Sequence, residues 1–133
     1  MNPRFLSKEN VVRLHEKVVK LYGGSHGVRD EGLLESALAQ PEAGFGDEYA
    51  HKDLLEMAAA YLYHLVQNHP FHDGNKRIGL AASSVFLEIN GIEVTASSDA
   101  FEELVLSTAR GEAKKPEITE FFRKNHAPLK PQE

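Results

Sequence analysis

The sequence predicts an all-α fold, a compact bundle of about six helices. One observation behind this prediction is that apolar residues recur at the helical spacing of three and four positions along most of the chain. The other is that residues typical of helix starts and stops separate these segments. The 133 residues suit a single domain, residues 1–133, with a core at about residues 5–125 and a frayed tail at residues 127–133.

Two helices are expected in the first part of the chain. Ser7 is a good N-cap for the first helix, which extends to about Tyr22 and stops at the glycine pair that follows. Asp30 is the expected N-cap of a short second helix. Pro41 ends this helix, because proline has no backbone N–H with which to continue the helical hydrogen bonds.

The segment after the second helix places two glycines around an aromatic residue, namely Gly44, Phe45 and Gly46. This pattern indicates either a mobile loop or a small hairpin. Such a segment can be a plain connection or a functional flap, and the residues alone leave both possibilities open.

Two strongly apolar helices form the expected core pair. Asp53 is the N-cap of the third helix, and the fourth helix starts near Lys76 and ends at Asn90 and Gly91. Both helices are apolar over more than half of their circumference, so we expect them at the centre of the bundle. Small residues at 81–84 would let the two helices pack closely.

The last third of the chain is expected to hold two further helices. Residues 92–94 are too few for more than an isolated extended piece. Ser98 or Asp99 is the expected N-cap of the fifth helix, and Pro116 starts the sixth at the first helical position, where proline is favoured.

Composition excludes several classes of function. The formal net charge of -5 disfavours general binding to nucleic acid, which needs a basic face to neutralise phosphates. No apolar stretch reaches the roughly 18 residues of a membrane-spanning helix, so no membrane partner is expected. The absence of cysteine fits a reducing compartment, and we expect a cytoplasmic protein.

Residues 69–77, which read HPFHDGNKR, form a polar loop between the two apolar helices. Pro70 pushes His69 out of helical geometry. A histidine is the usual general base near neutral pH, although a lone histidine more often hydrogen bonds to a helix end. Phe71 is expected to anchor the loop by burying its ring.

The second half of the loop has the residue types of an anion site. Asp73 can cap the fourth helix or hold Mg²⁺. Gly74 and Asn75 let backbone N–H groups at a helix start point at an anion. Lys76 and Arg77 are cations at a helix start, where the helix dipole disfavours them, so they need a compensating anion such as Asp73 or a bound phosphate.

The loop resembles the signature of the Fic/Doc superfamily, His-Pro-Phe-x-Asp-Gly-Asn-x-Arg. Lys76 stands where most adenylylating Fic enzymes have glycine, and this makes the chain similar to the Doc (death-on-curing) branch. Residues 27–41 are also similar to the N-terminal region of Doc proteins. The resemblance extends from about Phe5 to Asn125 and implies a Fic/Doc-like bundle with the motif loop between two central helices.

The resemblance also implies an activity. Doc toxins transfer the γ-phosphate of ATP to a threonine of the translation factor EF-Tu, which arrests translation. In this chain His69 would then be the base, and Asp73 would position Mg²⁺ through the nucleotide. Gly74 and Asn75 would form the phosphate cradle, with Asn75 bonded to a phosphate oxygen, and Lys76 and Arg77 would stabilise the phosphates. The loop around Phe45 would correspond to the flap that aligns the target segment.

We expect a separate protein to inhibit such an enzyme. The inhibitory motif of Fic proteins has a serine or threonine four positions before a glutamate, which glycine or asparagine follows. This spacing occurs at Ser98 and Glu102 and again at Thr108 and Glu112, but neither glutamate is followed by glycine or asparagine. The resemblance therefore implies a cognate antitoxin with a disordered tail that folds on binding.

Three other functions are alternatives. A Fic-type adenylyltransferase would move AMP from ATP to a protein hydroxyl; Lys76 would crowd its α-phosphate, which favours phosphoryl transfer. An HD-type metal phosphohydrolase would use the His72-Asp73 doublet, with further ligands drawn from His51, His64 and Asp99. A module that only sequesters its partner would need no base at residue 69.

Overall fold

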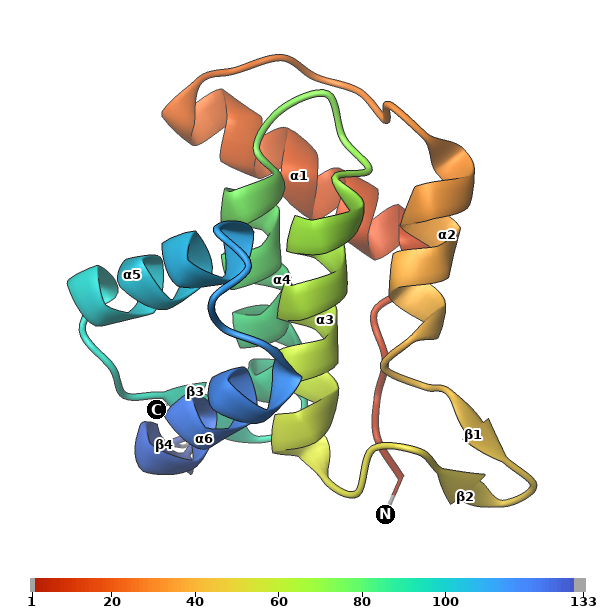
Figure 1. Ribbon diagram of the computed structural model, residues 1–133, viewed down its shortest axis with the longest axis vertical. Coiled ribbons are helices and arrows are strands. Elements are labelled where there is room, and N and C mark those ends of the chain that lie inside the picture. Colours follow the sequence, from red (N-terminus) through yellow and green to blue (C-terminus); the bar gives the residue numbers. More distant parts are fainter. Residues whose placement is uncertain (1, 131–133) are drawn as a thin grey trace.

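The computed structural model describes residues 2–130 and confirms the all-α fold (Figure 1). Within these residues, no helix is long and apolar enough to cross a membrane. The helices are α1 (Lys8–Tyr22), α2 (Glu31–Ala39), α3 (Leu54–Asn68), α4 (Asn75–Ile89), α5 (Ser98–Ala109) and α6 (Lys115–Lys124). The strands are β1 (Gly44–Phe45), β2 (Glu48–Tyr49), β3 (Ile92–Val94) and β4 (His126–Pro128).

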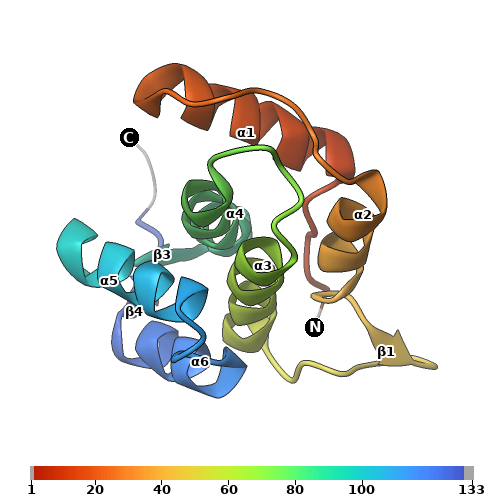
Figure 2. The same ribbon diagram turned by 45° about the horizontal axis from the view of Figure 1, so that its top comes forward.

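Helices α3 and α4 form the central pair, as the sequence predicts. They pack against each other, and the other helices surround them (Figure 2). α1 covers α4, α2 and α6 cover α3, and α5 contacts both. This arrangement buries nine residues of α3, among them Tyr61, whose hydroxyl accepts a hydrogen bond from the Leu6 N–H at 3.0 Å. The loop that joins the two central helices is therefore held at one end of the bundle.

The close contact between the central helices lies at Gly79. A Cβ atom at this position would come within 2.7 Å of Val66 Cγ2 and 3.3 Å of the Leu62 carbonyl oxygen. The sequence predicted that small residues at 81–84 would allow the close packing. Ala82 and Ser83 of this stretch are buried, whereas Ala81 lines a cleft, and Gly79 adds a close contact that the sequence analysis did not identify.

Local capping signals predicted three of the six helix starts correctly, and Pro116, expected at the first position of α6, is its second residue. Three expected N-caps accept a hydrogen bond from a first-turn N–H with their side-chain oxygens: Ser7, Asp30 and Asp53. The expected cap of α5 was wrong by one or two positions. Ser97, not Ser98 or Asp99, accepts from the Ala100 N–H, because Ser97 is the last residue with extended geometry.

The end of the described chain is paired, which contradicts two predictions. β4 pairs with β3 in antiparallel register, so residues 92–94 are not an isolated piece and residues 127–128 are not frayed. The Leu129 N–H extends the pairing by donating to the Gly91 carbonyl at 2.9 Å. Neither segment contains a sequence pattern that predicts pairing with a strand more than 30 residues away. Residues 131–133 of the expected tail lie outside the described residues.

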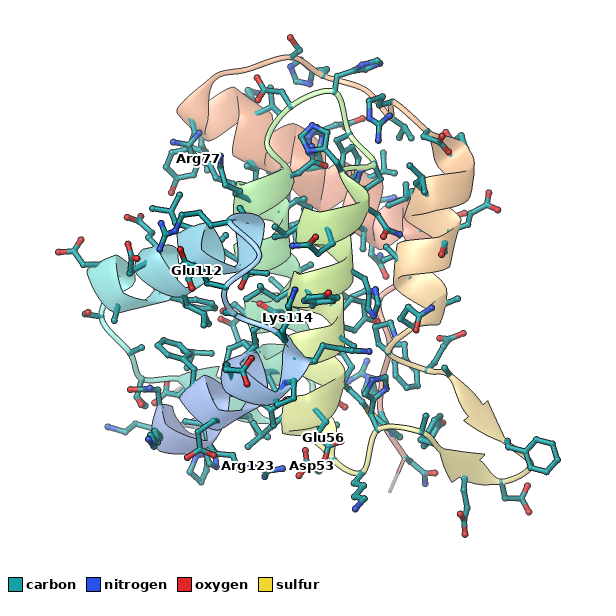
Figure 3. All side chains as sticks on the ribbon, viewed as in Figure 1. Asp53, Glu56, Arg77, Glu112, Lys114 and Arg123 are labelled. Carbon is teal, nitrogen blue, oxygen red and sulfur yellow. The ribbon has the colours of Figure 1, made fainter. Side chains whose placement is uncertain are left out.

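The far end of the bundle carries a surface ion-pair cluster (Figure 3). Arg123 of α6 lies 3.0 Å from Asp53 and 3.6 Å from Glu56, at the start of α3. These side chains are partly exposed, so each pair contributes at most about 1 kcal/mol. The central packing, rather than these pairs, holds the helices that frame the loop.

Substitution of Gly79 tests the packing of the central pair. Alanine at an interior helix position is favoured over glycine by about 1 kcal/mol, but overpacking a buried contact costs about 1–3 kcal/mol. We expect Gly79→Ala to lower the free energy of unfolding by about 1 kcal/mol in urea titrations. Gly32→Ala, on the exposed face of α2, is the matched control and should raise stability by about 0.5 kcal/mol.

The clash partner can be removed to check the cause. In a Val66→Ala background, Gly79→Ala should become neutral or stabilising, because the methyl group that it meets is gone. An equal loss of stability from Gly79→Ala in both backgrounds would contradict this packing account.

Candidate functional site

The loop of residues 69–74 opens onto a cleft of about 820 Å³. The end of α1, the end of α3, the start of α4 and one face of α5 form its walls. The cleft is lined by Val18, Tyr22, Val66, Gln67, His69, Asp73, Gly74, Asn75, Lys76, Arg77, Leu80, Ala81, Glu102, Val105, Leu106 and Ala109. All the residues of the predicted catalytic and phosphate site are in this set.

His69 ends α3 in a left-handed conformation, with φ 52° and ψ 53°. Among the described residues it is the one non-glycine residue with positive φ. This conformation costs about 1–3 kcal/mol and persists only where the surrounding structure enforces it. The prediction that Pro70 places His69 at a helix break is confirmed, and the exposed imidazole lines the cleft.

Arg29 stabilises this strained helix end. Its Nε donates to the His69 carbonyl oxygen at 2.8 Å, and Nη2 donates to the Asn68 carbonyl oxygen at 3.2 Å. The guanidinium thus satisfies carbonyl groups that the end of a helix leaves without partners. Reasoning from the sequence assigned Arg29 no role, although it lies in the segment that resembles Doc proteins.

The segment before α2 crosses over the motif loop (Figure 1). The backbone N–H groups of Arg29 and Asp30 donate to the Pro70 carbonyl oxygen at 2.7 and 3.1 Å. The His72 N–H donates to the Gly27 carbonyl oxygen at 3.1 Å. These bonds fix the loop from outside, so its shape depends on residues 40 positions earlier in the chain.

The Asn75 side chain closes the loop from inside. Its Oδ1 accepts from the Phe71 N–H at 2.9 Å, and its Nδ2 donates to the Phe71 carbonyl oxygen at 3.0 Å. The residue is 4% exposed, and the Phe71 ring is fully buried, as predicted. Both ends of the side-chain amide are thus bonded to Phe71, so a bond from Asn75 to a phosphate oxygen, which stays a prediction, would come from its backbone N–H at the start of α4.

Asp73 does not cap α4, contrary to one of its two predicted roles. Gly74 is the N-cap, with φ 75°, a conformation that glycine adopts without strain. Asp73 Oδ2 accepts from the Ser25 N–H at 3.1 Å, and Oδ1 accepts from the Gly74 N–H at 2.9 Å. These two bonds, the Ser25 bond first, lower the pKa of the Asp73 carboxyl group. The exposed carboxylate keeps further lone pairs that suit a hard cation.

The start of α4 presents positive charge that forms no salt bridge within the described residues. No side chain caps this helix start. Within residues 2–130, no carboxylate lies within 4.0 Å of the Lys76 or Arg77 nitrogen atoms. The Arg77 guanidinium instead lies 4.7 Å from the centre of the Tyr22 ring, at the end of α1 (Figure 3). Free helix N–H groups and two cations make this end of the cleft suited to an anion.

The structure does not bring the predicted flap to the cleft. Gly44, Phe45 and Gly46 form part of the β1–β2 hairpin, and Phe45 is 93% exposed. The hairpin lies beside the start of α3, whereas the motif loop follows its end (Figures 1 and 2). The 15 residues of α3 separate the two by roughly 22 Å. A hairpin was one of the two predicted forms, but a role beside His69 is not supported.

The ligands proposed for an HD-type metal site are also apart. The described part of the chain contains no group of three or more histidine, aspartate or glutamate side chains that could hold a metal ion. His64 Nε2 lies 3.2 Å from Lys115 Nζ, away from the His72-Asp73 doublet. Burial, with a smaller effect of Lys115, lowers the pKa of His64 to about 4. A neutral histidine that accepts a hydrogen bond from a lysine has a structural role here.

Two further residues line the cleft without having been predicted from the sequence. Tyr22 stacks on Arg77, and its signal was weak because it is the last residue of an amphipathic helix. Glu102 belongs to one of the incomplete inhibitory-motif matches and lies on the α5 wall. It forms no ion pair with Lys76 or Arg77 in the described residues.

Comparison with known proteins gives matches over most of the chain. The model of the Fic/DOC family matches residues 5–87. The chain is 31% identical over 121 residues to a protein named Protein kinase doc from Escherichia phage P1, covering 91% of this chain and 94% of that protein. It is 45% identical over 78 residues to a protein named Toxin Doc from Mycolicibacterium smegmatis (strain ATCC 700084 / mc(2)155), covering 59% of this chain and 60% of that protein.

Substitution of Asn75 tests its task in closing the loop. Asn75→Asp keeps an acceptor for the Phe71 N–H but places a buried oxygen against the Phe71 carbonyl oxygen. We expect a loss of about 1–3 kcal/mol of unfolding free energy in urea titrations, because a buried hydrogen bond is replaced by a repulsion. Lys76→Ala, one residue further and exposed, is the control and should change stability by less than about 0.5 kcal/mol. Unchanged stability of Asn75→Asp would contradict this role in closing the loop and would leave the Asn75 side chain available to bind a ligand.

Proposed function

The chain belongs to the Fic/DOC family, and on this basis we propose that it is a Doc-type toxin that transfers the γ-phosphoryl group of ATP to a hydroxyl side chain of a target protein. The names of the two relatives, a protein kinase and a toxin, support this proposal. By the resemblance of the motif, the proposed target is a threonine of EF-Tu, whose modification arrests translation.

The observation that carries the proposal is the positive charge at the start of α4, which forms no salt bridge within residues 2–130. Lys76 and Arg77 lie where the helix dipole disfavours cations, and the described residues offer them no carboxylate. Asp73, the nearest acidic residue along the chain, is instead hydrogen bonded to the Ser25 and Gly74 backbone. A fold that leaves this charge unpaired at the end of a cleft is suited to a ligand with phosphate groups.

The cleft fits a nucleotide in size and polarity. A volume of about 820 Å³ lies within the range of about 300–1,000 Å³ typical of ligand pockets. The polar groups lie at the loop. Val18, Leu80 and Val105 make the walls apolar, which suits the adenine ring of a nucleotide. A bound Mg²⁺ would supply positive charge that neutralises part of the charge of the phosphates. Asp73 is the residue that would hold it, because its carboxylate is exposed and its pKa is lowered.

His69 is the proposed general base. It lines the cleft beside the residues that would bind the phosphates, and its left-handed backbone conformation holds the imidazole at the helix end. In the proposed reaction its free ring nitrogen accepts the proton of the target hydroxyl. The hydroxyl oxygen then forms a bond with the γ-phosphorus, the bond from that phosphorus to the β–γ bridging oxygen breaks, and ADP leaves.

Lys76 favours phosphoryl transfer over the alternative, adenylyl transfer. An ammonium group at the helix start supplies charge to a terminal phosphate, where negative charge is greatest. The same long side chain occupies space that an α-phosphate would need in order to face the acceptor. Transfer of AMP to the target hydroxyl is therefore the alternative reaction, and the labelling experiment below distinguishes it from transfer of the γ-phosphoryl group.

We place the cognate antitoxin on the same cleft. Tyr22 on one wall and Leu106 on another are 63% and 41% exposed, so both offer apolar surface beside the cleft to a partner. A disordered antitoxin segment that folds on binding would cover these side chains and block the access to His69.

Labelled ATP tests the proposed reaction. The protein is incubated with EF-Tu, Mg²⁺ and ATP labelled at either the γ- or the α-phosphate, and the label on EF-Tu is measured. We expect label from γ-labelled ATP only. His69→Ala should lower the rate by about a hundredfold or more, because a general base is lost.

His72→Ala is the matched control for this experiment. His72 is the other exposed histidine of the loop and does not line the cleft, so its loss should leave the rate within about threefold of wild type. Label from α-labelled ATP would establish adenylyl transfer instead. Label from neither position, with folded protein, would refute both reactions on this target.

Lys76 itself can be tested in the same assay. Lys76→Gly should lower transfer of the γ-label by roughly a hundredfold, and Lys76→Arg should retain more of it, because the charge is kept. The melting temperature should change little, because the gain from removing a cation at a helix start offsets most of the cost of a glycine within the helix. Equal transfer of the γ-label by wild type and Lys76→Gly would contradict the role given to Lys76.

A further inference from the structure

A histidine in α1 is buried where the helix would be expected to present an apolar side chain. His15 follows Val11 by four positions on the face that packs against the rest of the protein, and it is 1% exposed. A polar group so deeply buried is costly unless it is hydrogen bonded. The proposed reaction gives this residue no task, so its partners need an explanation.

Both partners of His15 belong to the motif loop. Its Nε2 lies 2.7 Å from the Asp73 carbonyl oxygen. Since a carbonyl oxygen can only accept, Nε2 carries the hydrogen and donates it. The imidazole also stacks on the Phe71 ring, with ring centres 3.8 Å apart and planes 8° from parallel. One side chain of α1 thus contacts the loop on both sides of His72.

The hydrogen bond determines which way the Asp73–Gly74 peptide faces. A peptide is planar, so drawing the carbonyl group towards His15 turns the Gly74 N–H to the opposite side. There this N–H donates to the Asp73 carboxylate at 2.9 Å. The carbonyl oxygen points into the protein interior at His15, which does not line the cleft.

This orientation matters for an anion at the helix start. The Asp73 carbonyl group belongs to the peptide just before Gly74, the N-cap of α4, and rotated into the cleft it would direct a partial negative charge at the ligand. Gly74 completes the arrangement: a Cβ atom at this position would lie 3.4 Å from His15 Nε2, in addition to the strain of φ 75°. The contact between α1 and the loop therefore keeps this carbonyl oxygen away from the anion site, which is left to the N–H groups of the first turn of α4.

We propose that His15 is a positioning residue, whose hydrogen bond to the Asp73 carbonyl oxygen sets the orientation of the Asp73–Gly74 peptide and so shapes the anion site at the start of α4. This inference rests on the proposed function for the identity of the anion. The orientation of the peptide itself does not depend on that function, and the two can be measured separately.

Two substitutions at residue 15 separate the hydrogen bond from the packing. His15→Phe keeps an aromatic ring against Phe71 but removes the donor. His15→Gln restores a nitrogen donor at nearly the same reach as Nε2. If His15→Phe does not fold, His15→Met fills the space without a donor and takes its place, with folding checked by circular dichroism.

The first measurement uses backbone amide NMR spectra of the protein without ligand. We expect the Gly74 and Asn75 amide signals to move in His15→Phe and to return towards their wild-type positions in His15→Gln. The second measurement is the affinity for inorganic pyrophosphate with Mg²⁺, by calorimetry. It should fall about tenfold in His15→Phe, the effect of misaligned charge-assisted hydrogen bonds, and recover to within about threefold in His15→Gln.

The outcomes distinguish this proposal from the proposed function. A folded His15→Phe with unchanged Gly74 and Asn75 signals, or with wild-type affinity for pyrophosphate, would overturn the positioning role. Failure of His15→Gln to restore either quantity would overturn it as well, since packing alone would then explain the effect. If wild-type protein binds no pyrophosphate, the anion site of the proposed function fails, while the amide signals still decide the orientation of the peptide.

Discussion

The bidentate contact between the Asn75 side chain and the Phe71 backbone is the interaction on which the site depends. Two apolar helices, α3 and α4, pack closely and leave only six residues to reverse the chain between them. A buried backbone in so short a loop must find hydrogen-bond partners without regular secondary structure. Asn75 supplies an acceptor and a donor to one buried residue at once. The loop therefore closes on itself, and its outer face stays available to a ligand.

The rest of the loop is held from outside by elements that precede it in the chain. Arg29 binds the carbonyl groups at the end of α3, Gly27 pairs with His72, and Ser25 binds the Asp73 carboxylate. The two charged features of the site follow from this scaffold. His69 is kept in a strained conformation at the cleft, and the carboxylate that could have neutralised Lys76 is turned to the backbone. The strained His69 and the two cations at the start of α4 both lower the stability of the fold. Such local destabilisation is expected where function rather than folding determines the positions of the residues.

Reasoning from the sequence succeeded where the determinants are local. The N-caps Ser7 and Asp53, the break at His69 and the central position of the two apolar helices all depend on residues a few positions apart. It failed where a partner is distant or where two local roles compete. The pairing of β3 with β4 has no local signal, and Asp73 looked like a helix cap until its partner Ser25 was known.

The sequence also does not determine where two features of the site point in space. Asn75 has the chemistry of a phosphate ligand, but the loop uses both ends of its side-chain amide, so its backbone N–H is the group that can meet an anion. The hairpin around Phe45 lies at the other end of the bundle from the motif loop, because α3 runs between the two. Composition and spacing do not fix either orientation.

The orientation of a bound nucleotide is the most direct test of the central claim, that the start of α4 holds the phosphate to be transferred. The decisive measurement is a crystal structure of the protein with Mg²⁺ and a non-hydrolysable ATP analogue. Our account predicts that the γ-phosphate contacts the backbone N–H groups at the start of α4 and the Lys76 ammonium group, with the His69 imidazole facing it. An α-phosphate in that position, or a nucleotide bound outside the cleft, would contradict it.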